Sequence, residues 1–208
     1  MSTLYAIYEQ HVFPRALDFV LRRLAELRMD ALAETHGEVL ELGFGTGLNL
    51  PHYPHAVRRV TTADPMDSLP RRVRARIDAA PFPVEVHHVR ADGELPFDAG
   101  RFDCVALTWT LCSIPDPVTA LREVRRVLRP RGTLHFLEHV RSEDPRVARW
   151  QDRWNPLQRF FACGCNVNRD MEAIIRAGGF SLARCRRFRL DRYPRIMAEM
   201  VQGVAVRS

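Results

Sequence analysis

Three glycines alternate with other residues directly after a short apolar segment. Gly43, Gly45 and Gly47 lie in the stretch VLELGFGTGLN of residues 39–49. Because glycine has no Cβ, the backbone here can turn tightly and approach a bound ligand closely. A helix is expected directly after the turn, and its first N–H groups can hold a carboxylate or a phosphate. The dinucleotide pattern Gly-x-Gly-x-x-Gly is not met, since Leu48 occupies its third glycine position.

An acidic residue follows at the distance that a nucleoside site requires. Asp64 lies 21 residues beyond Gly43, at the end of the second expected strand. A carboxylate there can accept hydrogen bonds from both hydroxyl groups of a ribose. NAD and S-adenosylmethionine both have these hydroxyl groups, so Asp64 alone does not indicate which of the two cofactors binds. The spacing of the glycines does distinguish them, because it does not fit the dinucleotide pattern. The alternative is a turn that only packs, which the strand before it, the expected helix after it and Asp64 disfavour.

The elements that must position these residues alternate between strand and helix. An amphipathic helix is expected over residues 14–33, with Leu17, Leu21 and Leu24 along one side. A second is expected over residues 117–128. The expected strands cover residues 38–42, 57–63, 84–89, 102–108 and 133–138. This alternation predicts an α/β fold with a mostly parallel sheet and helices on both faces.

The regular pattern breaks over residues 141–168, a stretch too long for a plain connection. Trp150, Trp154, Phe160 and Phe161 lie there among prolines and arginines, which predicts a lid with aromatic walls. A helix over residues 170–177 and strands over 181–188 and 197–206 would complete a seven-stranded sheet. We therefore expect one domain over residues 1–208, consisting of a helical cap (1–36), a ligand-binding core (37–140), the lid (141–168) and a C-terminal helix with strands (169–208).

The composition disfavours several classes of protein. The net charge is +6, and all 31 basic residues are arginine. Without lysine there is no Schiff base and no P-loop lysine, so pyridoxal enzymes and P-loop nucleotidases are disfavoured. The five cysteines include no Cys-x-x-Cys pair, which argues against a disulfide framework or a zinc ribbon. No apolar run could span a bilayer and no signal peptide is evident, so a soluble, cytoplasmic protein is expected.

The strand, the glycine turn and the downstream acid together resemble the class I S-adenosylmethionine-dependent methyltransferases, over nearly the whole chain. The resemblance implies their Rossmann-like fold and S-adenosylmethionine as the cofactor. It implies that Glu41 lies near the methionine amino group, Asn49 near the carboxylate and Asp64 at the ribose. The other implied cofactor residues line the methionine moiety, pack on the adenine or face the methyl donor: Gly43, Phe44, Gly45, Pro65, Met66 and Thr108.

The segment ADGELPF at residues 91–97 resembles the motif that borders the adenine in this family. The family's usual acidic position falls on Ala91, and the carboxylate comes one residue later, at Asp92. Either Asp92 takes over the contact with the adenine amino group, beside Gly93, or backbone amides alone make it. A simple turn at Asp92 and Gly93 is the alternative without a ligand.

Four segments of the C-terminal half narrow the resemblance. They are TWTLCSIPD at residues 108–116, LRPRG at 128–132, FLEH at 136–139 and GCNVNRD at 164–170. In this order they resemble a bacterial branch similar to the animal alkyl-thiol S-methyltransferases. More distant resemblances are to the ubiquinone and menaquinone C-methylases and to the small bacterial phosphatidylethanolamine N-methyltransferases. An apolar thiol is therefore the favoured acceptor, and a quinone or a phospholipid is the alternative.

Side chains that follow the fourth and fifth strands are expected to face the methyl donor, because ligands bind at the carboxyl ends of strands in such sheets. The set comprises Thr108, Trp109, Cys112, Ser113, Glu138 and His139. His139 is the candidate proton acceptor, or a structural residue that bonds the lid. Cys112 and Cys165 are expected to be buried small apolar side chains rather than reactive thiols. A thiol acceptor needs little help, since a few per cent of it is already thiolate at neutral pH.

Two further kinds of partner are considered. Arg22, Arg23 and Arg28 could hold the N-terminal helix on an anionic membrane surface, although a cap with its apolar side inward is favoured. Arginine runs at residues 71–76 and 184–192 could bind nucleic acid, but charge runs are usually solvated, so no nucleic-acid partner is expected. No metal site is expected from the scattered histidines. A monomer or a weak homodimer that acts on a small molecule is the overall expectation.

Overall fold

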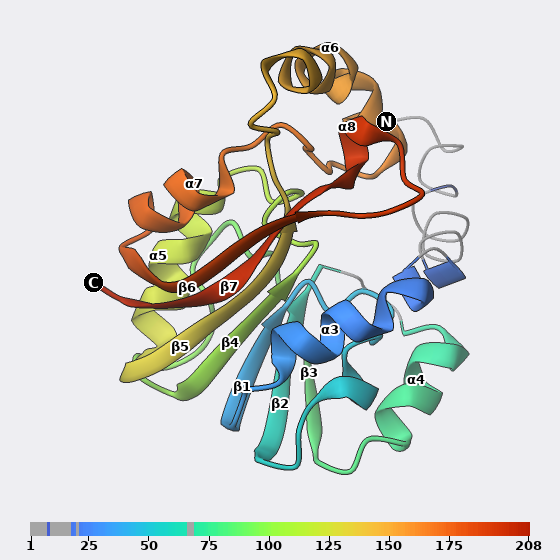
Figure 1. Ribbon diagram of the computed structural model, residues 1–208. Helices are drawn as coiled ribbons and strands as arrows, with labels where there is room; N and C mark the ends of the chain where they lie inside the picture. Colours follow the sequence, from blue (N-terminus) through green and yellow to red (C-terminus); the bar gives the residue numbers. More distant parts are fainter. Residues whose placement is uncertain (1–7, 9–17, 20, 66–68) are drawn as a thin grey trace.

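The computed structural model describes Tyr8 and residues 18–19, 21–65 and 69–208. Seven strands of this part of the chain form one sheet, in the order β3-β2-β1-β4-β5-β7-β6 (Figure 1). Neighbours among β1 to β5 are parallel, while β7 runs antiparallel between β5 and β6. The strands are β1 (Gly37–Leu42), β2 (Val57–Asp64), β3 (Val84–His88), β4 (Phe102–Thr108), β5 (Leu128–His139), β6 (Phe180–Arg189) and β7 (Glu199–Arg207). The predicted mostly parallel, seven-stranded sheet is confirmed.

Helices cover both faces of the sheet, as predicted (Figure 1). One face carries α3 (Ala25–Leu32) and α4 (Arg71–Asp78), and the other carries α5 (Pro117–Val127) and α7 (Met171–Ala177). The longest helix, α6 (Pro145–Phe161), packs against α8 (Arg195–Ala198) beyond the end of the sheet. None of the helices in the described residues combines the length and the apolar composition needed to cross a bilayer.

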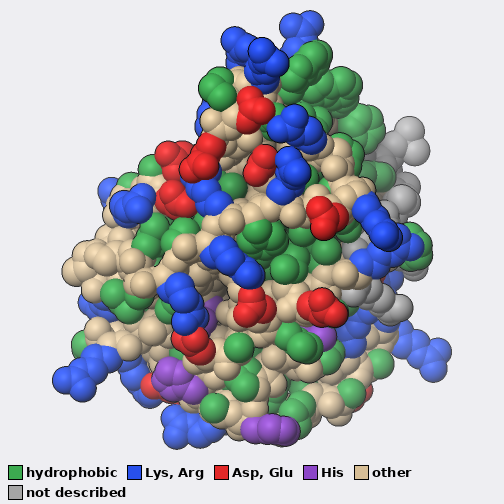
Figure 2. All heavy atoms as spheres, in the orientation of Figure 1, with side chains coloured by type: hydrophobic (Ala, Val, Ile, Leu, Met, Phe, Trp, Pro, Cys, Tyr) green, Lys and Arg blue, Asp and Glu red, His purple; other side chains and the backbone are tan. Residues whose placement is uncertain are grey.

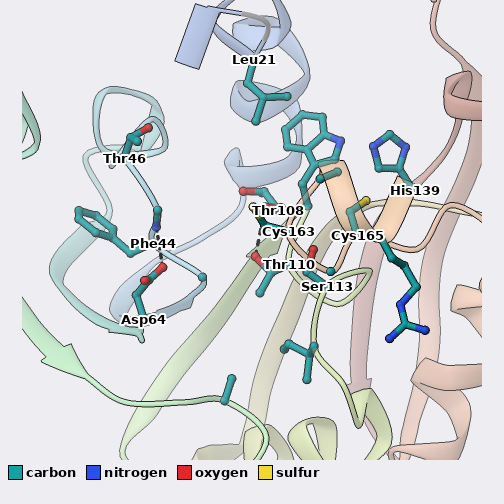
Figure 3. Close-up of a pocket in the computed structure, with 18 of the residues that line it drawn as sticks. Leu21, Phe44, Thr46, Asp64, Thr108, Thr110, Ser113, His139, Cys163 and Cys165 are labelled. Carbon is teal, nitrogen blue, oxygen red and sulfur yellow. Dashed lines mark hydrogen bonds between the residues drawn. The ribbon is translucent and has the colours of Figure 1, made fainter. Parts of the chain in front are cut away.

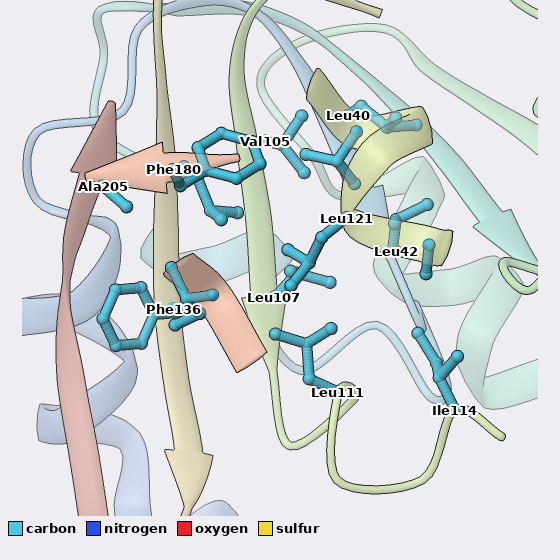
Figure 4. Close-up of a cluster of buried hydrophobic side chains, with 14 of the residues drawn as sticks. Leu40, Leu42, Val105, Leu107, Leu111, Ile114, Leu121, Phe136, Phe180 and Ala205 are labelled. Carbon is cyan, nitrogen blue, oxygen red and sulfur yellow. The ribbon is translucent and has the colours of Figure 1, made fainter. Parts of the chain in front are cut away.

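Alternation along the central strands divides the core between the two faces. In β1, Val39 packs towards α3 and α4, whereas Leu40 packs towards α5 and α7. Cys104 and Val105 of β4 alternate in the same way. Figure 4 shows the larger cluster, in which side chains of β1, β4 and β5 surround Leu121 of α5. Burial on both faces explains why these strands are apolar almost throughout.

The segment after the glycine turn differs from the prediction. Instead of an α-helix, it contains only the 3-10 turn η3 (Leu50–His52). Pro51 and Pro54 explain the difference, because each lacks a backbone N–H and disfavours a helical conformation in the preceding residue. Tyr53, which precedes Pro54, is extended at φ −69° and ψ 134°. The turn therefore has no α-helix N-terminus that could hold an anion.

The N-terminal helix and the fifth strand also differ from their expected bounds. The expected start, residues 14–17, lies outside the described residues, and the described part is divided into the 3-10 turn η2 (Arg22–Leu24) and α3. Strand β5 begins at Leu128 rather than at Thr133. Its pairing with β4 shifts register between Phe102 and Cys104, which accommodates the added residues 128–132 in the strand.

Residues 141–168, where a lid was expected, consist of a long helix with short connections. Asp144 caps α6 by accepting a hydrogen bond from Arg146 N (2.8 Å), and Pro145 occupies its first turn. The helix continues through Pro156 to Phe161. The role of residues 141–168 as a lid stays a prediction.

Acidic side chains engage many arginines of the two basic runs. Asp18 pairs with Arg72 (3.4 Å) and Arg76 (3.0 Å) beside α4. In β6, three further pairs bring arginine and carboxylate within 2.8 Å: Arg184 with Glu34, Arg186 with Asp30, and Arg187 with Glu172. These pairs reduce the charge that either run could offer to a nucleic acid.

Candidate functional site

A cavity of about 990 Å³ lies at the carboxyl ends of β1, β2, β4 and β5 (Figure 3). Gly43, Asp64, Thr108 and His139, from the ends of these four strands, all line it. A cavity of this volume can hold a small-molecule ligand. Figure 3 shows Phe44 and Asp64 on one side of the cavity, and His139 and Cys165 on the other.

The glycine turn forms one wall and is held by the predicted acid. Gly43, Gly45 and Gly47 all have positive φ angles, of 73°, 55° and 74°, which glycine adopts readily. Asp64 accepts a hydrogen bond from Gly45 N at 2.8 Å. A Cβ at Gly43 would overlap Thr110, whereas a Cβ at Gly45 would meet nothing within 4 Å. The backbone of Gly45 therefore borders space that a ligand can enter.

Beneath the turn, Glu41 is fully buried in a polar network. Its carboxylate accepts hydrogen bonds from Asn49 Nδ2 (2.9 Å) and Tyr53 Oη (2.8 Å). Burial raises the pKa of Glu41 to about 7, although the hydrogen bond from Tyr53 and the charge of Arg28 oppose the shift. This carboxyl group is consequently poised to ionise when a cation binds beside it.

Arg28 of α3 is a site residue that sequence analysis did not identify. Its NH1 donates to Asn49 Oδ1 (2.6 Å) and Thr108 Oγ1 (3.2 Å), and its guanidinium lies 4.7 Å from the ring centroid of Trp109. Burial lowers the pKa of Arg28 to about 10, and Nε has no hydrogen-bond partner among the described residues. The interpretation of Arg28 as part of a membrane-facing surface was wrong, because this side chain lines the cavity.

Most of the predicted cofactor residues meet at this cavity. Those that line it are Glu41, Gly43, Phe44, Gly45, Asp64, Pro65, Asp92 and Thr108. Asn49 does not line it but is buried beneath it, bonded to Glu41 and Arg28. Gly93 does not line it and is exposed, and Met66 lies outside the described residues. The turn, the acid after β2 and the carboxylate in β1 thus surround one space.

Comparison with known proteins agrees with this geometry. Residues 40–136 match the family model described as a methyltransferase domain. The thiol S-methyltransferase TMT1A of Homo sapiens is 31% identical over 175 residues, which are 81% of this chain and 70% of that protein. The chain is a class I S-adenosylmethionine-dependent methyltransferase.

Two further similarities concern the breadth of the family and its fold. The methyltransferase is 33% identical to the ubiquinone/menaquinone biosynthesis C-methyltransferase UbiE of Hahella chejuensis, over 55% of this chain and 47% of that protein. A SAM-dependent methyltransferase from Thermotoga maritima has the same fold, with a TM-score of 0.69 and 20% identity over 98% of this chain and 100% of that chain. The predicted Rossmann-like methyltransferase fold is confirmed.

The cavity of the methyltransferase fits its cofactor, S-adenosylmethionine, on three counts. The open side at Gly45 leaves room against the backbone, and Asp64 stands where a ribose acid is expected. The carboxyl group of Glu41 and the guanidinium of Arg28 both line the cavity and interact electrostatically. This pair is complementary to the ammonium and carboxylate groups of the methionine moiety. Because no α-helix begins at the turn, the positive charge nearest to Glu41 and Asn49 is that of Arg28, which hydrogen-bonds to Asn49.

Asp92 of the methyltransferase is held in a bidentate pair at the rim of the cavity. Arg90 Nε donates to its Oδ1 (3.0 Å) and Arg90 NH2 donates to its Oδ2 (2.7 Å), which lowers the pKa of Asp92. Ala91 lines the cavity beside it. Since Arg90 already engages both carboxylate oxygens, a contact between Asp92 and an adenine stays a prediction.

Two expectations for the strand ends were wrong. Glu138 is fully buried, does not line the cavity, and accepts hydrogen bonds from Thr110 N (2.8 Å), Leu111 N (2.9 Å) and Cys112 N (3.2 Å). It therefore anchors the loop after β4. Cys112 also lies beneath the cavity, with its Sγ 3.5 Å from that of Cys165. This contact and burial raise the pKa of Cys112 well above its usual value, as expected of an unreactive thiol.

His139 lines the cavity at the end of β5. Burial lowers its pKa to about 4, and Nδ1 has no hydrogen-bond partner among the described residues. The ring is therefore neutral at physiological pH and can accept a hydrogen bond. A group with so low a pKa is a weak base for a thiol, an alcohol or a phenol.

The lining of the cavity is mainly apolar. Trp109, Ile114, Leu190 and Met197 line it, together with Cys163 and Cys165 from the loop after α6. Of the four aromatic side chains expected to form lid walls, Phe160 lines the cavity, whereas Trp150, Trp154 and Phe161 do not. Three acids line the cavity: Glu41 lies in β1, Asp64 ends β2 and Asp92 follows β3.

Proposed function

We propose that the methyltransferase methylates the sulfur atom of a small, apolar thiol. The observation that carries this proposal is a mainly apolar cavity lining whose one imidazole, His139, is neutral and weakly basic. A thiol has an ordinary pKa near 8.5 and supplies a small fraction of thiolate by itself. Its methylation therefore requires positioning more than a strong base. The similarity to a protein named as a thiol S-methyltransferase supports the same acceptor.

Positioning is the main contribution that the chain's residues make. Glu41 would bind the amino group of the methionine moiety, Arg28 its carboxylate and Asp64 the ribose. The cofactor supplies an electrophilic methyl group. His139 would accept a hydrogen bond from the acceptor thiol and fix the direction of its sulfur. Holding two reactants in line in this way is worth up to about 7–11 kcal/mol.

Replacement of Arg28 tests its assignment to the carboxylate. Arg28→Gln is expected to weaken binding of S-adenosylhomocysteine about 10-fold, equivalent to about 1.5 kcal/mol for a lost charged hydrogen bond. An analogue of S-adenosylhomocysteine that lacks the carboxylate should bind the wild-type protein and the variant with nearly equal affinity. Titration calorimetry with both ligands measures the difference. Equal losses for both ligands would show that Arg28 acts on the structure of the network rather than on the carboxylate.

The acceptor class is tested by turnover. Purified protein is incubated with labelled S-adenosylmethionine and a panel of alkyl thiols, amines, phenols, a ubiquinone precursor and phosphatidylethanolamine. We expect S-methylation of apolar thiols, with a rate that rises about 10-fold per pH unit below the thiol pKa, because only the thiolate reacts. A faster reaction with the quinone precursor or the lipid would replace the thiol proposal, and the similarity to UbiE makes the quinone the first alternative.

A further inference from the structure

Helix α6 buries two amide side chains, beside Val147 and Ala148, and exposes its largest apolar side chains. Its buried side presents Gln151 and Asn155, which bond to Val140 O (3.2 Å) and to Asn166 Oδ1 (2.9 Å). Its outer side presents Trp150, Trp154, Leu157 and Phe161, each between 44% and 54% exposed. These four residues are spaced by four, three and four positions, so they form one continuous stripe along the helix. We call them the α6 stripe. Large apolar side chains gathered on an outer surface mark an interaction site.

Arginines run beside the stripe. Arg146, Arg149 and Arg153 follow at intervals of three and four, and none of them forms an ion pair with a described residue. Together with Trp150 they line a surface hollow of about 460 Å³. The one acid of the helix, Asp152, is already engaged by Arg141. Figure 2 shows arginine and hydrophobic side chains side by side at the top of the molecule, where α6 lies in Figure 1.

We propose that the α6 stripe and its arginines dock the methyltransferase on an anionic lipid bilayer, with α6 lying in the plane of the interface. Tryptophan prefers the boundary between headgroups and acyl chains, and arginine binds lipid phosphates. The stripe is narrow, and arginines without ion pairs to described residues border it. This arrangement fits an anionic bilayer, whose acyl chains lie beneath negatively charged headgroups. The three arginines that line the hollow carry positive charge that can bind a lipid phosphate.

Docking through α6 would also orient the cavity. Pro156, Arg159 and Phe160 belong to the same helix and line the cavity. A membrane on the α6 stripe therefore lies next to the cavity mouth, and an apolar acceptor can enter from the lipid. This delivery step rests on the proposed function, whereas docking does not. The docking surface differs from the N-terminal helix considered from the sequence, since Arg28 of that helix is buried.

The test uses the full-length chain and two kinds of vesicle, pure phosphatidylcholine and phosphatidylcholine with phosphatidylglycerol. Flotation at low salt is expected to recover the protein with the anionic vesicles, and high salt should release most of it. Trp150→Ser combined with Trp154→Ser should reduce binding at least 10-fold. A triple variant that combines Arg146→Glu, Arg149→Glu and Arg153→Glu should also reduce vesicle binding at least 10-fold. Because all five side chains are exposed, cofactor binding and melting temperature should stay unchanged.

A triple variant elsewhere controls for net charge. Arg71→Glu, Arg122→Glu and Arg131→Glu change exposed arginines away from α6 by the same total charge and should leave vesicle binding nearly intact. Equal losses in both triple variants would overturn the proposal, as would absence of wild-type binding. A dimer that dissociates on substitution of the tryptophans would make the stripe a protein interface instead, which also overturns it. Calorimetry with S-adenosylhomocysteine reports separately on the proposed function.

Discussion

Replacing Gly45 by alanine is expected to weaken binding of S-adenosylhomocysteine by as much as about 100-fold while the protein remains folded. A methyl group at this position would enter the open space beside the turn. Filling space that a ligand occupies costs about 1–3 kcal/mol, or about 5- to 150-fold in Kd. The positive φ of 55° adds a backbone cost of about 1–2 kcal/mol to the folded protein. Titration calorimetry and thermal unfolding measure the two effects.

Gly100 offers a matched control for backbone strain. Its φ is 69°, a Cβ there would also meet nothing within 4 Å, and it does not line the cavity. Gly100→Ala should therefore lower the melting temperature about as much as Gly45→Ala and leave the Kd unchanged. In Gly43→Ala the new methyl overlaps Thr110, so unfolding should be easier still. If Gly45→Ala bound the cofactor like wild type, this part of the cavity would not hold it.

Binding of the cofactor should strengthen as the pH rises towards neutrality, because Glu41 must lose a proton to pair with an ammonium group. Its pKa of about 7 means that the group is mostly protonated below this pH. The Kd for S-adenosylhomocysteine should fall about 10-fold per pH unit between pH 5.5 and 7, then level off. Glu41→Gln should weaken binding at pH 7.5 by about 2–3 kcal/mol, or about 30- to 150-fold, and remove this dependence.

A substitution at Tyr53 tests the physical cause of this pH dependence. The Tyr53 hydroxyl donates to Glu41 and favours its ionised form, opposing the upward shift. Tyr53→Phe should therefore move the midpoint of the Kd profile to higher pH. Calorimetry in two buffers of different ionisation enthalpy should detect one proton released on binding below pH 7. A flat profile in the wild-type protein would mean that Glu41 does not contact the amino group.

Local patterns sufficed for the sheet and for the cofactor side of the site. Alternating apolar segments predicted all seven strands, and most of their ends agree with the structure to within one or two residues. The placement of Gly45 beside Asp64 follows from their positions at the ends of β1 and β2, since neighbouring parallel strands end at one edge of the sheet. Strands β1 and β2 follow each other along the chain and also pair in the sheet. The number of residues between Gly45 and Asp64 is therefore enough to predict that they lie together.

Helix α6 shows where the pattern of apolar residues misleads. The Asp144-Pro145 pair is a helix-start signal like Asp116-Pro117 before α5, and it was available in the sequence. The aromatic side chains Trp150, Trp154 and Phe161 were nevertheless assigned to a wall of the cavity, because apolar side chains are normally buried. In the structure the buried side of α6 is held by hydrogen bonds of Gln151 and Asn155. Periodicity alone cannot tell which side of a helix faces the protein.

By itself, the sequence determined the fold, the glycine turn and the acid beside it, since each depends on backbone conformation or on the order of strands. Only the tertiary structure decided the roles of Arg28, Glu138 and α6. Arg28 reaches Asn49 and Thr108 across 21 and 80 positions of the chain. No local spacing encodes such contacts, because they arise when α3 packs against the sheet and brings a distant charge to the ends of its strands.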